Sequence, residues 1–206
     1  VRVPDGFRVS LFADDDLASN IYSMTIDALG RVVVAGPGYV KILHDRDGDG
    51  RAESFTVFSE RPTGGAQGLF FDGSDLLATG DGAMWRLRDT DGDGWSDSGD
   101  AFPTEGTQWS DSDSDGYGDN NASLAFQPDA CPTTDGNSTL DRYGCPDGDG
   151  DGYSDPDANS QAHPFGSADA FLNDSTQWHD TDADGFGDNP AGNNPDSCPS
   201  EYGTST

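Results

Sequence analysis

The stretch Asp89–Asp97 reads D-T-D-G-D-G-W-S-D, with acidic residues at positions 1, 3, 5 and 9 and glycine at position 6. The same spacing recurs at residues 45–53, 111–119, 147–155 and 180–188. Calcium takes about six to eight oxygen ligands, and short acidic loops provide carboxylates from positions 1, 3 and 5 and a backbone carbonyl from position 7. Glycine at position 6 adopts the positive φ that folds the acids around one point. The five copies therefore predict five calcium-binding loops.

Each loop has the same predicted ligands: the acids at positions 1, 3, 5 and 9 and the backbone carbonyl at position 7. In chain order they are Asp45, Asp47, Asp49, Arg51 and Glu53; Asp89, Asp91, Asp93, Trp95 and Asp97; Asp111, Asp113, Asp115, Tyr117 and Asp119; Asp147, Asp149, Asp151, Tyr153 and Asp155; and Asp180, Asp182, Asp184, Phe186 and Asp188. No loop has the bidentate glutamate at position 12 of a helix–loop–helix calcium site, so further ligands must come from elsewhere. The alternative is a run of solvated acidic turns, since Asp and Gly are also common in ordinary turns.

Charge is distributed unevenly along the 206 residues. Residues 1–88 carry 9 basic and 13 acidic residues, a net charge of −4, whereas residues 89–206 carry 1 arginine and 26 acidic residues, a net charge of −25. Only 32% of the residues are hydrophobic, and such self-repulsion normally leaves a segment disordered. About five calcium ions would offset about ten of these charges. The acidic half excludes nucleic acid as a partner, because phosphate binding needs a basic surface.

The sequence also indicates a compartment. No run of about 18 apolar residues occurs, so no membrane-spanning helix is predicted. The chain begins at Val1 without an initiator methionine or a signal-peptide pattern, so we expect a mature or excised piece of a longer protein. Loops with incomplete ligand sets suit the calcium concentration outside cells. We therefore expect a secreted, extracellular or cell-surface protein.

Residues 1–88 contain the β-branched, aromatic and apolar runs typical of strands, bounded by Gly, Pro and Asp. The predicted strands are residues 7–12, 24–27, 31–35, 39–43, 54–58, 69–71, 76–79 and 84–87. The pattern repeats after 44 or 45 residues, so that Asp27 matches Asp72 and Asp45 matches Asp89. A repeat of this length with about four strands has the size of one propeller blade. We expect two such blades in residues 1–88.

Several segments resemble the start of bacterial soluble-glucose-dehydrogenase-like β-propellers, over about residues 1–98. They are P-D-G-F-R-V-S-L-F-A at 4–13, V-K-I-L-H-D-R-D-G-D-G-R-A-E at 40–53, G-L-F-F-D at 68–72 and W-R-L-R-D-T-D-G-D-G at 85–94. The cofactor- and substrate-binding residues of that family lie largely in later blades, so no catalytic or cofactor-binding residue is carried over. The resemblance implies a mainly β region of two propeller-like blades, not a closed propeller. Those blades would pack on the C-terminal half, on another copy or on missing sequence.

Residues 89–206 have almost no apolar periodicity, so almost no helix is expected. Residues 101–120 recur as 170–189, and P-D-A-C-P at 128–132 recurs as P-D-S-C-P at 195–199. With the D-x-D-x-D-G loops, this unit resembles thrombospondin type 3 repeats, most closely the prokaryotic form in outer-membrane porin linkers and secreted surface proteins. The resemblance covers about residues 89–206 and implies an irregular chain wound around a row of calcium ions that replaces a hydrophobic core. It adds three calcium ligands: Asp129, Asp141 and Asp196.

Cysteines and sequons give further expectations for this acidic segment. Cys131 and Cys145, each followed by proline, predict a disulfide in an extracellular module, with two free thiols as the alternative. Cys198 matches Cys131 in the repeat, and its partner would lie beyond the end of the sequence, so we expect it to be unpaired. Possible N-glycosylation sites are Asn121, Asn137 and Asn173.

We divide the chain into a β-rich, propeller-blade-like region at residues 1–88 and acidic thrombospondin type 3-like repeats at residues 89–206. No catalytic motif stands out, so we expect a non-enzymatic, extracellular calcium-binding structural or adhesion module, a calcium-stiffened stalk carrying a small β region. Besides calcium, its expected partners are other copies of itself, a cell-surface protein or carbohydrate. One alternative is a subunit of a self-assembling extracellular filament or surface layer, because unclosed blades expose strand edges. The other is a fragment of a sugar-dehydrogenase-like propeller enzyme, against which the missing blades count.

Overall fold

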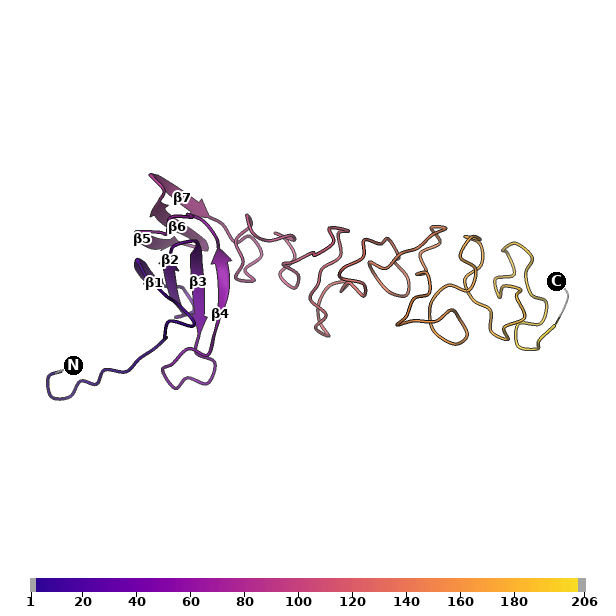
Figure 1. The fold of residues 1–206 in the computed structure, drawn as a ribbon, viewed down its shortest axis with the longest axis horizontal. Helices are drawn as coiled ribbons and strands as arrows, with labels where there is room; N and C mark the ends of the chain where they lie inside the picture. Colours follow the sequence, from indigo (N-terminus) through magenta and orange to yellow (C-terminus); the bar gives the residue numbers. More distant parts are fainter. Residues whose placement is uncertain (1–2, 204–206) are drawn as a thin grey trace. The chain divides into compact units, whose positions relative to one another are not determined.

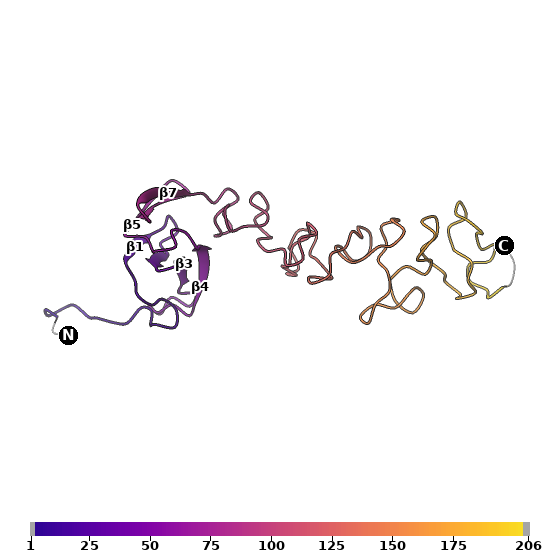
Figure 2. The same ribbon diagram turned by 45° about the horizontal axis from the view of Figure 1, so that its top comes forward.

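The computed structural model describes residues 3–203 (Figure 1). The chain divides into two compact units, the β unit (Val1–Trp109) and the acidic unit (Ser110–Thr206). All seven strands lie in the β unit, and neither unit contains a helix in its described residues. Figure 2 shows the same contrast between the strand arrows and the irregular backbone that follows them. The predicted mainly β character of the N-terminal region is confirmed.

The β unit opens with an antiparallel sheet of four strands in sequence order: β1 (Ser23–Ile26), β2 (Val32–Gly36), β3 (Tyr39–His44) and β4 (Ser54–Ser59). Asp27 fixes the turn between β1 and β2, since its Oδ1 accepts hydrogen bonds from the amides of Leu29 and Arg31 at 2.9 and 2.8 Å. An aspartate in this position mimics a backbone turn. The connection between β3 and β4 contains the first acidic loop, residues 45–53.

A second antiparallel sheet has three strands in sequence order: β5 (Gly68–Asp72), β6 (Asp75–Gly80) and β7 (Ala83–Leu87). The β6–β7 hairpin turns through Asp81 and Gly82, whose φ angles are 53° and 74°. Two positive φ values match the twist of the strands in a two-residue hairpin, which is why Asp-Gly is favoured there. No closed barrel or propeller is formed by the described strands.

The two sheets share one hydrophobic core because strand residues alternate between faces. Val33 and Ile42 from the first sheet and Leu76 from the second are at most 2% exposed and belong to one buried cluster. The opposite face of the first sheet has a smaller cluster around Val34 and Leu43. Burial of each such side chain contributes about 1.5–3 kcal/mol, so this region has a conventional source of stability.

Seven of the eight predicted strands are confirmed, and the prediction for residues 7–12 is wrong. That segment pairs with no strand in the described chain, and Phe7, Val9 and Leu11 are 73%, 62% and 59% exposed. It runs outside the two sheets in Figures 1 and 2. The alternating pattern favours a strand, but a strand also needs a partner edge for its backbone hydrogen bonds.

The β unit extends beyond residue 88 to Trp109, because the chain after β7 returns to the first sheet. The amide of Ser96, within the acidic loop at 89–97, donates to the Phe58 carbonyl of β4 at 2.9 Å. That loop therefore packs with the strands. A fourth strand beside β7, at the place that β4 occupies in the first sheet, does not occur in the described residues.

The acidic unit has a polar interior. Its buried hydrophobic residues are Cys145 and Ala168, among those that the structure describes. The buried polar side chains are more numerous: Asp129, Ser138, Ser154, Asp169, Gln177, Asp180 and Asp196. Two apolar residues cannot offset the chain entropy of about a hundred residues, which costs on the order of 1–2 kcal/mol each. Something other than apolar burial must therefore stabilise this unit.

The predicted disulfide is present. Cys131 and Cys145 are joined, with their Cα atoms 5.1 Å apart, and Cys198 is exposed and free. The three sequon asparagines, Asn121, Asn137 and Asn173, are exposed, and their glycosylation stays a prediction. Within residues 3–203, the structure has no helix long and apolar enough to cross a membrane.

Candidate metal sites

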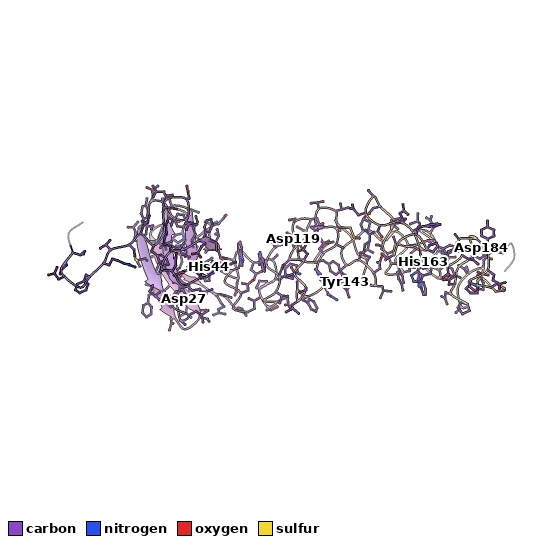
Figure 3. All side chains as sticks on the ribbon, turned by 90° about the horizontal axis from the view of Figure 1, so that it is seen from below. Asp27, His44, Asp119, Tyr143, His163 and Asp184 are labelled. Atoms are coloured by element: carbon purple, nitrogen blue, oxygen red, sulfur yellow. A yellow bond between two sulfur atoms is a disulfide. The ribbon has the colours of Figure 1, made fainter. Side chains whose placement is uncertain are left out.

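Five acidic loops, numbered in chain order, contain the candidate metal sites: loop 1 (45–53), loop 2 (89–97), loop 3 (111–119), loop 4 (147–155) and loop 5 (180–188). In each loop the carboxylates at positions 1, 3 and 5 converge, with one oxygen from each within 4.8 Å of the others. The converging residues are Asp45, Asp47 and Asp49; Asp89, Asp91 and Asp93; Asp111, Asp113 and Asp115; Asp147, Asp149 and Asp151; and Asp180, Asp182 and Asp184. Figure 3 labels Asp184 of loop 5 among the side chains of the irregular backbone.

Hydrogen bonds from the loop backbone to the acid at position 1 build this convergence. In loop 4, the two oxygens of Asp147 accept from the amides of Gly150 and Gly152, both at 2.8 Å. Loops 1 to 3 use the amides at the same two positions, and loop 5 uses those at positions 5 and 6. Glycine at position 6 has a φ of 87° to 97° in all five loops, a conformation that L side chains rarely adopt. The backbone therefore requires this glycine.

Position 7 is tied to position 5, because its amide donates to the position-5 carboxylate at 2.7–2.9 Å in every loop. The predicted ligand at position 7 is the backbone carbonyl, and two of the side chains make ring contacts. Tyr117 stacks on Tyr143 with ring centroids 5.9 Å apart, and Tyr153 stacks on Trp178 at 5.3 Å. The remaining position-7 residues are Arg51, Trp95 and Phe186.

The acid at position 9 closes each loop. In loop 2, Asp97 Oδ1 accepts from the Thr90 amide and Oδ2 accepts from the Thr90 hydroxyl, both at 2.8 Å. Asp119, Asp155 and Asp188 accept from the amide at position 2 in the same way. Of the described loops, only loop 1 brings its position-9 acid, Glu53, into the converging set. Glu53 also accepts a hydrogen bond from the position-2 amide of its loop, that of Arg46, at 3.0 Å, so this backbone bond is common to all five loops.

Distant aspartates bring a fourth carboxylate to loops 3 and 5. The amide of Asp129 donates to the Gly118 carbonyl at position 8 of loop 3, at 2.9 Å, and that of Asp196 donates to the Gly187 carbonyl of loop 5, at 2.8 Å. Asp129 is 4% exposed and Asp196 is 7% exposed. In each residue Oδ1 accepts from the amide two residues on, whereas the buried Oδ2 has no hydrogen-bond partner.

Asp169 holds the corresponding place at loop 4 and Asp100 lies near loop 2, and neither residue was predicted from the sequence. The amide of Asp169 donates to the Ser154 carbonyl at position 8 of loop 4, at 2.8 Å, and Asp169 is 1% exposed. Asp100 follows loop 2, and the charges of Asp91 and Asp89 act on it. The missed signal is a short motif at 100–102, 129–131, 169–171 and 196–198: D-A-F, D-A-C, D-A-F and D-S-C.

Buried carboxylates without partners are the main electrostatic feature of these sites. The unpartnered buried carboxylate oxygens belong to Asp91, Asp93, Asp113, Asp129, Asp149, Asp151, Asp182 and Asp196. Burial, with repulsion from neighbouring acids, raises the pKa of Asp93 and of Asp129 to about 6 and that of Asp169 to about 7. A buried carboxylate oxygen with no donor is costly unless a cation binds it. The donor set is entirely oxygen, which fits a hard divalent cation such as calcium.

Asp141, like Asp97, has both carboxylate oxygens bonded to a single residue. Its Oδ1 accepts from the Ser154 amide at 2.8 Å, and its Oδ2 accepts from the Ser154 hydroxyl at 2.6 Å. Both oxygens are therefore engaged by one residue of loop 4, and Asp141 belongs to no converging set.

Loop 1 differs from the other four in exposure. Asp47, Asp49 and Glu53 are exposed, and loop 1 has no unpartnered buried oxygen among the described atoms. Arg46 and Arg51 lie inside the loop, and Arg51 approaches Asp14 at 3.9 Å. Loop 1 therefore contains the acids of the motif, but its carboxylates are more exposed to solvent than those of loops 2 to 5.

Comparison with known proteins identifies a family for the N-terminal part. Residues 1–115 match the family model described as Domain of unknown function (DUF7133). The match spans the β unit and ends inside loop 3, and no curated protein or solved structure matches the chain. Because the match covers more than half of the 206 residues, the chain belongs to the DUF7133 family.

Proposed function

We propose that this protein is an extracellular calcium-binding structural module in which calcium takes the place of a hydrophobic core in the acidic unit. The pair Asp129 and Asp196 is the observation that carries the proposal. Each is more than nine-tenths buried, its amide donates to the carbonyl at position 8 of an acidic loop, and one of its carboxylate oxygens has no hydrogen-bond partner. An isolated buried carboxylate costs several kcal/mol, so these two positions favour a bound cation.

Calcium fits these sites better than other metals do. Zinc sites in proteins use cysteine and histidine, whereas the converging sets contain only carboxylates. Magnesium demands near-octahedral geometry and retains several waters, while calcium accepts the larger and irregular oxygen sets that such loops provide. The Cys131–Cys145 disulfide supports an oxidising, extracellular location, where calcium is abundant.

The role we propose for calcium is structural. Metal bound to a site that is absent from the unfolded chain contributes its binding free energy to folding. The acidic unit has two buried hydrophobic residues in its described part, so this contribution would be the main one. The unit then acts as a calcium-stiffened spacer or adhesion segment that carries the β unit.

Calorimetric titration of the chelator-treated protein with calcium tests the proposal. The expected stoichiometry is about five, one ion for each loop. Magnesium at the same concentrations should give a much weaker signal, because it dehydrates reluctantly. Absence of calcium binding, or a stoichiometry of one, would remove the basis of the proposal.

Self-assembly is a second candidate function that one observation favours. The outer edge of β7 pairs with no strand in the described chain, and the exposed segment 7–11 has the alternating apolar pattern of a strand. An open edge and an unpaired strand-like segment are complementary, so one copy could add its segment to the sheet of another. Light scattering in saturating calcium should show oligomers that Val9→Lys reduces, and a monomer at high concentration would exclude this function.

A further inference from the structure

Loop 4 is held at its exit by two adjacent residues from the segment that the disulfide closes, residues 131–145. Ser154, at position 8 of the loop, is fully buried. Asp141 accepts both hydrogen bonds that Ser154 can donate, from the amide at 2.8 Å and from the hydroxyl at 2.6 Å. Position 8 is glycine in loops 3 and 5, so those loops have no side chain for such a contact.

The guanidinium group of Arg142 donates three hydrogen bonds to the same part of the chain. Nε donates to the Ser154 hydroxyl, Nη2 to the Asp155 carbonyl and Nη1 to Asp157 Oδ2, each at 2.8 Å. The Arg142 side chain is 15% exposed. It is the one Lys or Arg residue in the sequence from 89 to 206, and its guanidinium bonds three residues at and just after the end of loop 4.

Through Ser154, Asp141 and Arg142 are also connected to Asp169, the additional carboxylate beside loop 4. Ser154 uses its amide and hydroxyl for Asp141, and its carbonyl accepts the amide of Asp169 at 2.8 Å. Any shift of Ser154 would therefore shift Asp169 relative to the converging acids of loop 4. The carboxylate of Asp155 accepts a hydrogen bond from the Gly148 amide at 3.2 Å. The backbone carbonyl of Asp155 accepts a hydrogen bond from Arg142.

We propose that Asp141 and Arg142 are positioning residues that preset loop 4 for calcium, a refinement that rests on the proposed calcium-binding function. Asp141 lies outside the converging set of loop 4, and both of its oxygens accept hydrogen bonds from Ser154, so we assign it the role of orienting that residue. Groups that orient metal ligands in this way typically contribute about 10–100-fold to metal affinity. The Cys131–Cys145 disulfide holds the segment from which both residues project.

Glycine amides allow the affinity of each loop to be measured separately. The position-6 amides of Gly50, Gly94, Gly116, Gly152 and Gly185 each donate to the position-1 carboxylate of their own loop. In glycine-labelled full-length protein, NMR titration with calcium would follow all five signals. Asp141→Ala and Arg142→Ala should weaken binding reported by Gly152 about 10–100-fold, and leave Gly116 and Gly185 near wild type.

Asp141→Asn separates positioning from direct ligation. The amide side chain keeps a hydrogen-bonding partner for Ser154 but loses the negative charge, so a positioning residue keeps most of the loop 4 affinity. Arg142→Lys, which keeps the charge without the planar fork, should lie between wild type and Arg142→Ala. Asp129→Asn is the matched control, and it should weaken the Gly116 response as a lost ligand would.

Three results would overturn the proposal. An Asp141→Asn protein as weak as Asp141→Ala would make Asp141 a direct ligand. An unchanged Gly152 response in both alanine variants would remove any role in loop 4. Equal losses at Gly116, Gly152 and Gly185 would show a general effect on folding. If the wild-type protein shows no calcium response at any glycine, the proposed function itself fails, which is a distinct result.

Discussion

Asp169 illustrates how a carboxylate can lie beside an acidic loop that is distant from it in the sequence. It is 14 residues beyond the end of loop 4 at Asp155, yet its amide binds the loop at Ser154. Burial, then a hydrogen bond from Phe171 that acts in the opposite direction, then repulsion from Asp151 and Asp149 determine its raised pKa. Such a buried carboxylate lowers the stability of the fold when no cation is bound, and it provides a ligand when a cation is present.

Replacing Asp169 with Asn should lower the calcium affinity of loop 4 by at least about tenfold, because the neutral amide is a weaker ligand. Calorimetry would also show the stoichiometry falling by one at calcium concentrations that still fill the other loops. The matched control is Asp135→Asn, which removes the same charge from an exposed position. A loss of equal size in the control would mean that overall charge, not ligation, explains the effect.

Ala183, at position 4 of loop 5, has a φ of 63°, in the left-handed region that L residues avoid. Position 4 of loop 4 is Gly150, with a φ of 81° and open space where a Cβ would be. Ala183→Gly should therefore raise the free energy of unfolding of the calcium-loaded protein by about 1 kcal/mol. Gly150→Ala should lower it by a similar amount, and thermal unfolding in saturating calcium measures both. Changes of the same sign in the two variants would contradict this reasoning.

At the scale of the elements, the five loops share one hydrogen-bond scheme but differ in what surrounds them. Loop 1 connects β3 to β4 and is open to solvent, whereas loops 2 to 5 each have an additional aspartate nearby. Calcium affinity in such loops depends on the number of charged ligands and on rigidity. The loop motif alone therefore does not set the affinity.

Loop 1 should bind calcium most weakly of the five. Its four acids include no buried extra carboxylate, and Arg46 and Arg51 reduce its local negative charge. In a calcium titration followed by glycine amides, Gly50 should respond last, at a concentration at least about tenfold above that for Gly116. A Gly50 response at or below the concentration for Gly116 would refute this ordering.

Calcium affinity should fall as the pH falls. Metal-free Asp129 and Asp169 have pKa values raised to about 6 and about 7, so a proton occupies the ligand increasingly as the pH drops through that range. Calcium must displace this proton, and binding releases it. The dissociation constants of loops 3 and 4 should rise steadily between about pH 8 and about pH 5. Potentiometric detection of no proton release near pH 6.5 would contradict the prediction.

At the scale of the whole molecule, the two units have different sources of stability. The β unit buries aliphatic residues between two sheets, while the acidic unit buries mainly polar side chains and has one disulfide. A 15-residue disulfide loop contributes about 3 kcal/mol in the chain-entropy model, too little to fold a unit of this size. Metal ions are the remaining candidate for the acidic unit.

Chelation should unfold the acidic unit and leave the β unit largely folded. Limited proteolysis in excess chelator should cut within residues 110–206 and leave a protected fragment of residues 1–109. Hydrogen exchange should show retained protection in β2, β3 and β6, whose residues form the hydrophobic core. Equal protease resistance of the acidic unit with and without calcium would contradict the calcium-core model.

Local spacing in the sequence was enough to predict the loop acids and seven strands. Positions 1, 3 and 5 converge because the backbone of a nine-residue loop folds them together, and the Gly at position 6 makes this possible. The Cys131–Cys145 pair was likewise predictable from an extracellular, acidic context. The strand pattern at residues 7–12 misled because alternation specifies which face is apolar, not whether an edge is free to pair.

The sequence by itself determined which short segments fold into acidic loops, because hydrogen bonds within nine residues decide that geometry. Only the tertiary structure decided that Asp169 lies beside loop 4, through a backbone hydrogen bond at position 8. Asp129 and Asp196, which the repeat resemblance implied, reach loops 3 and 5 in the same way. The tertiary structure also decided that Asp141 binds Ser154 and that Asp97 binds its own loop. The physical reason is that a carboxylate has the same chemistry in a ligand, a turn or a clamp, and its neighbours in space determine which of these it becomes.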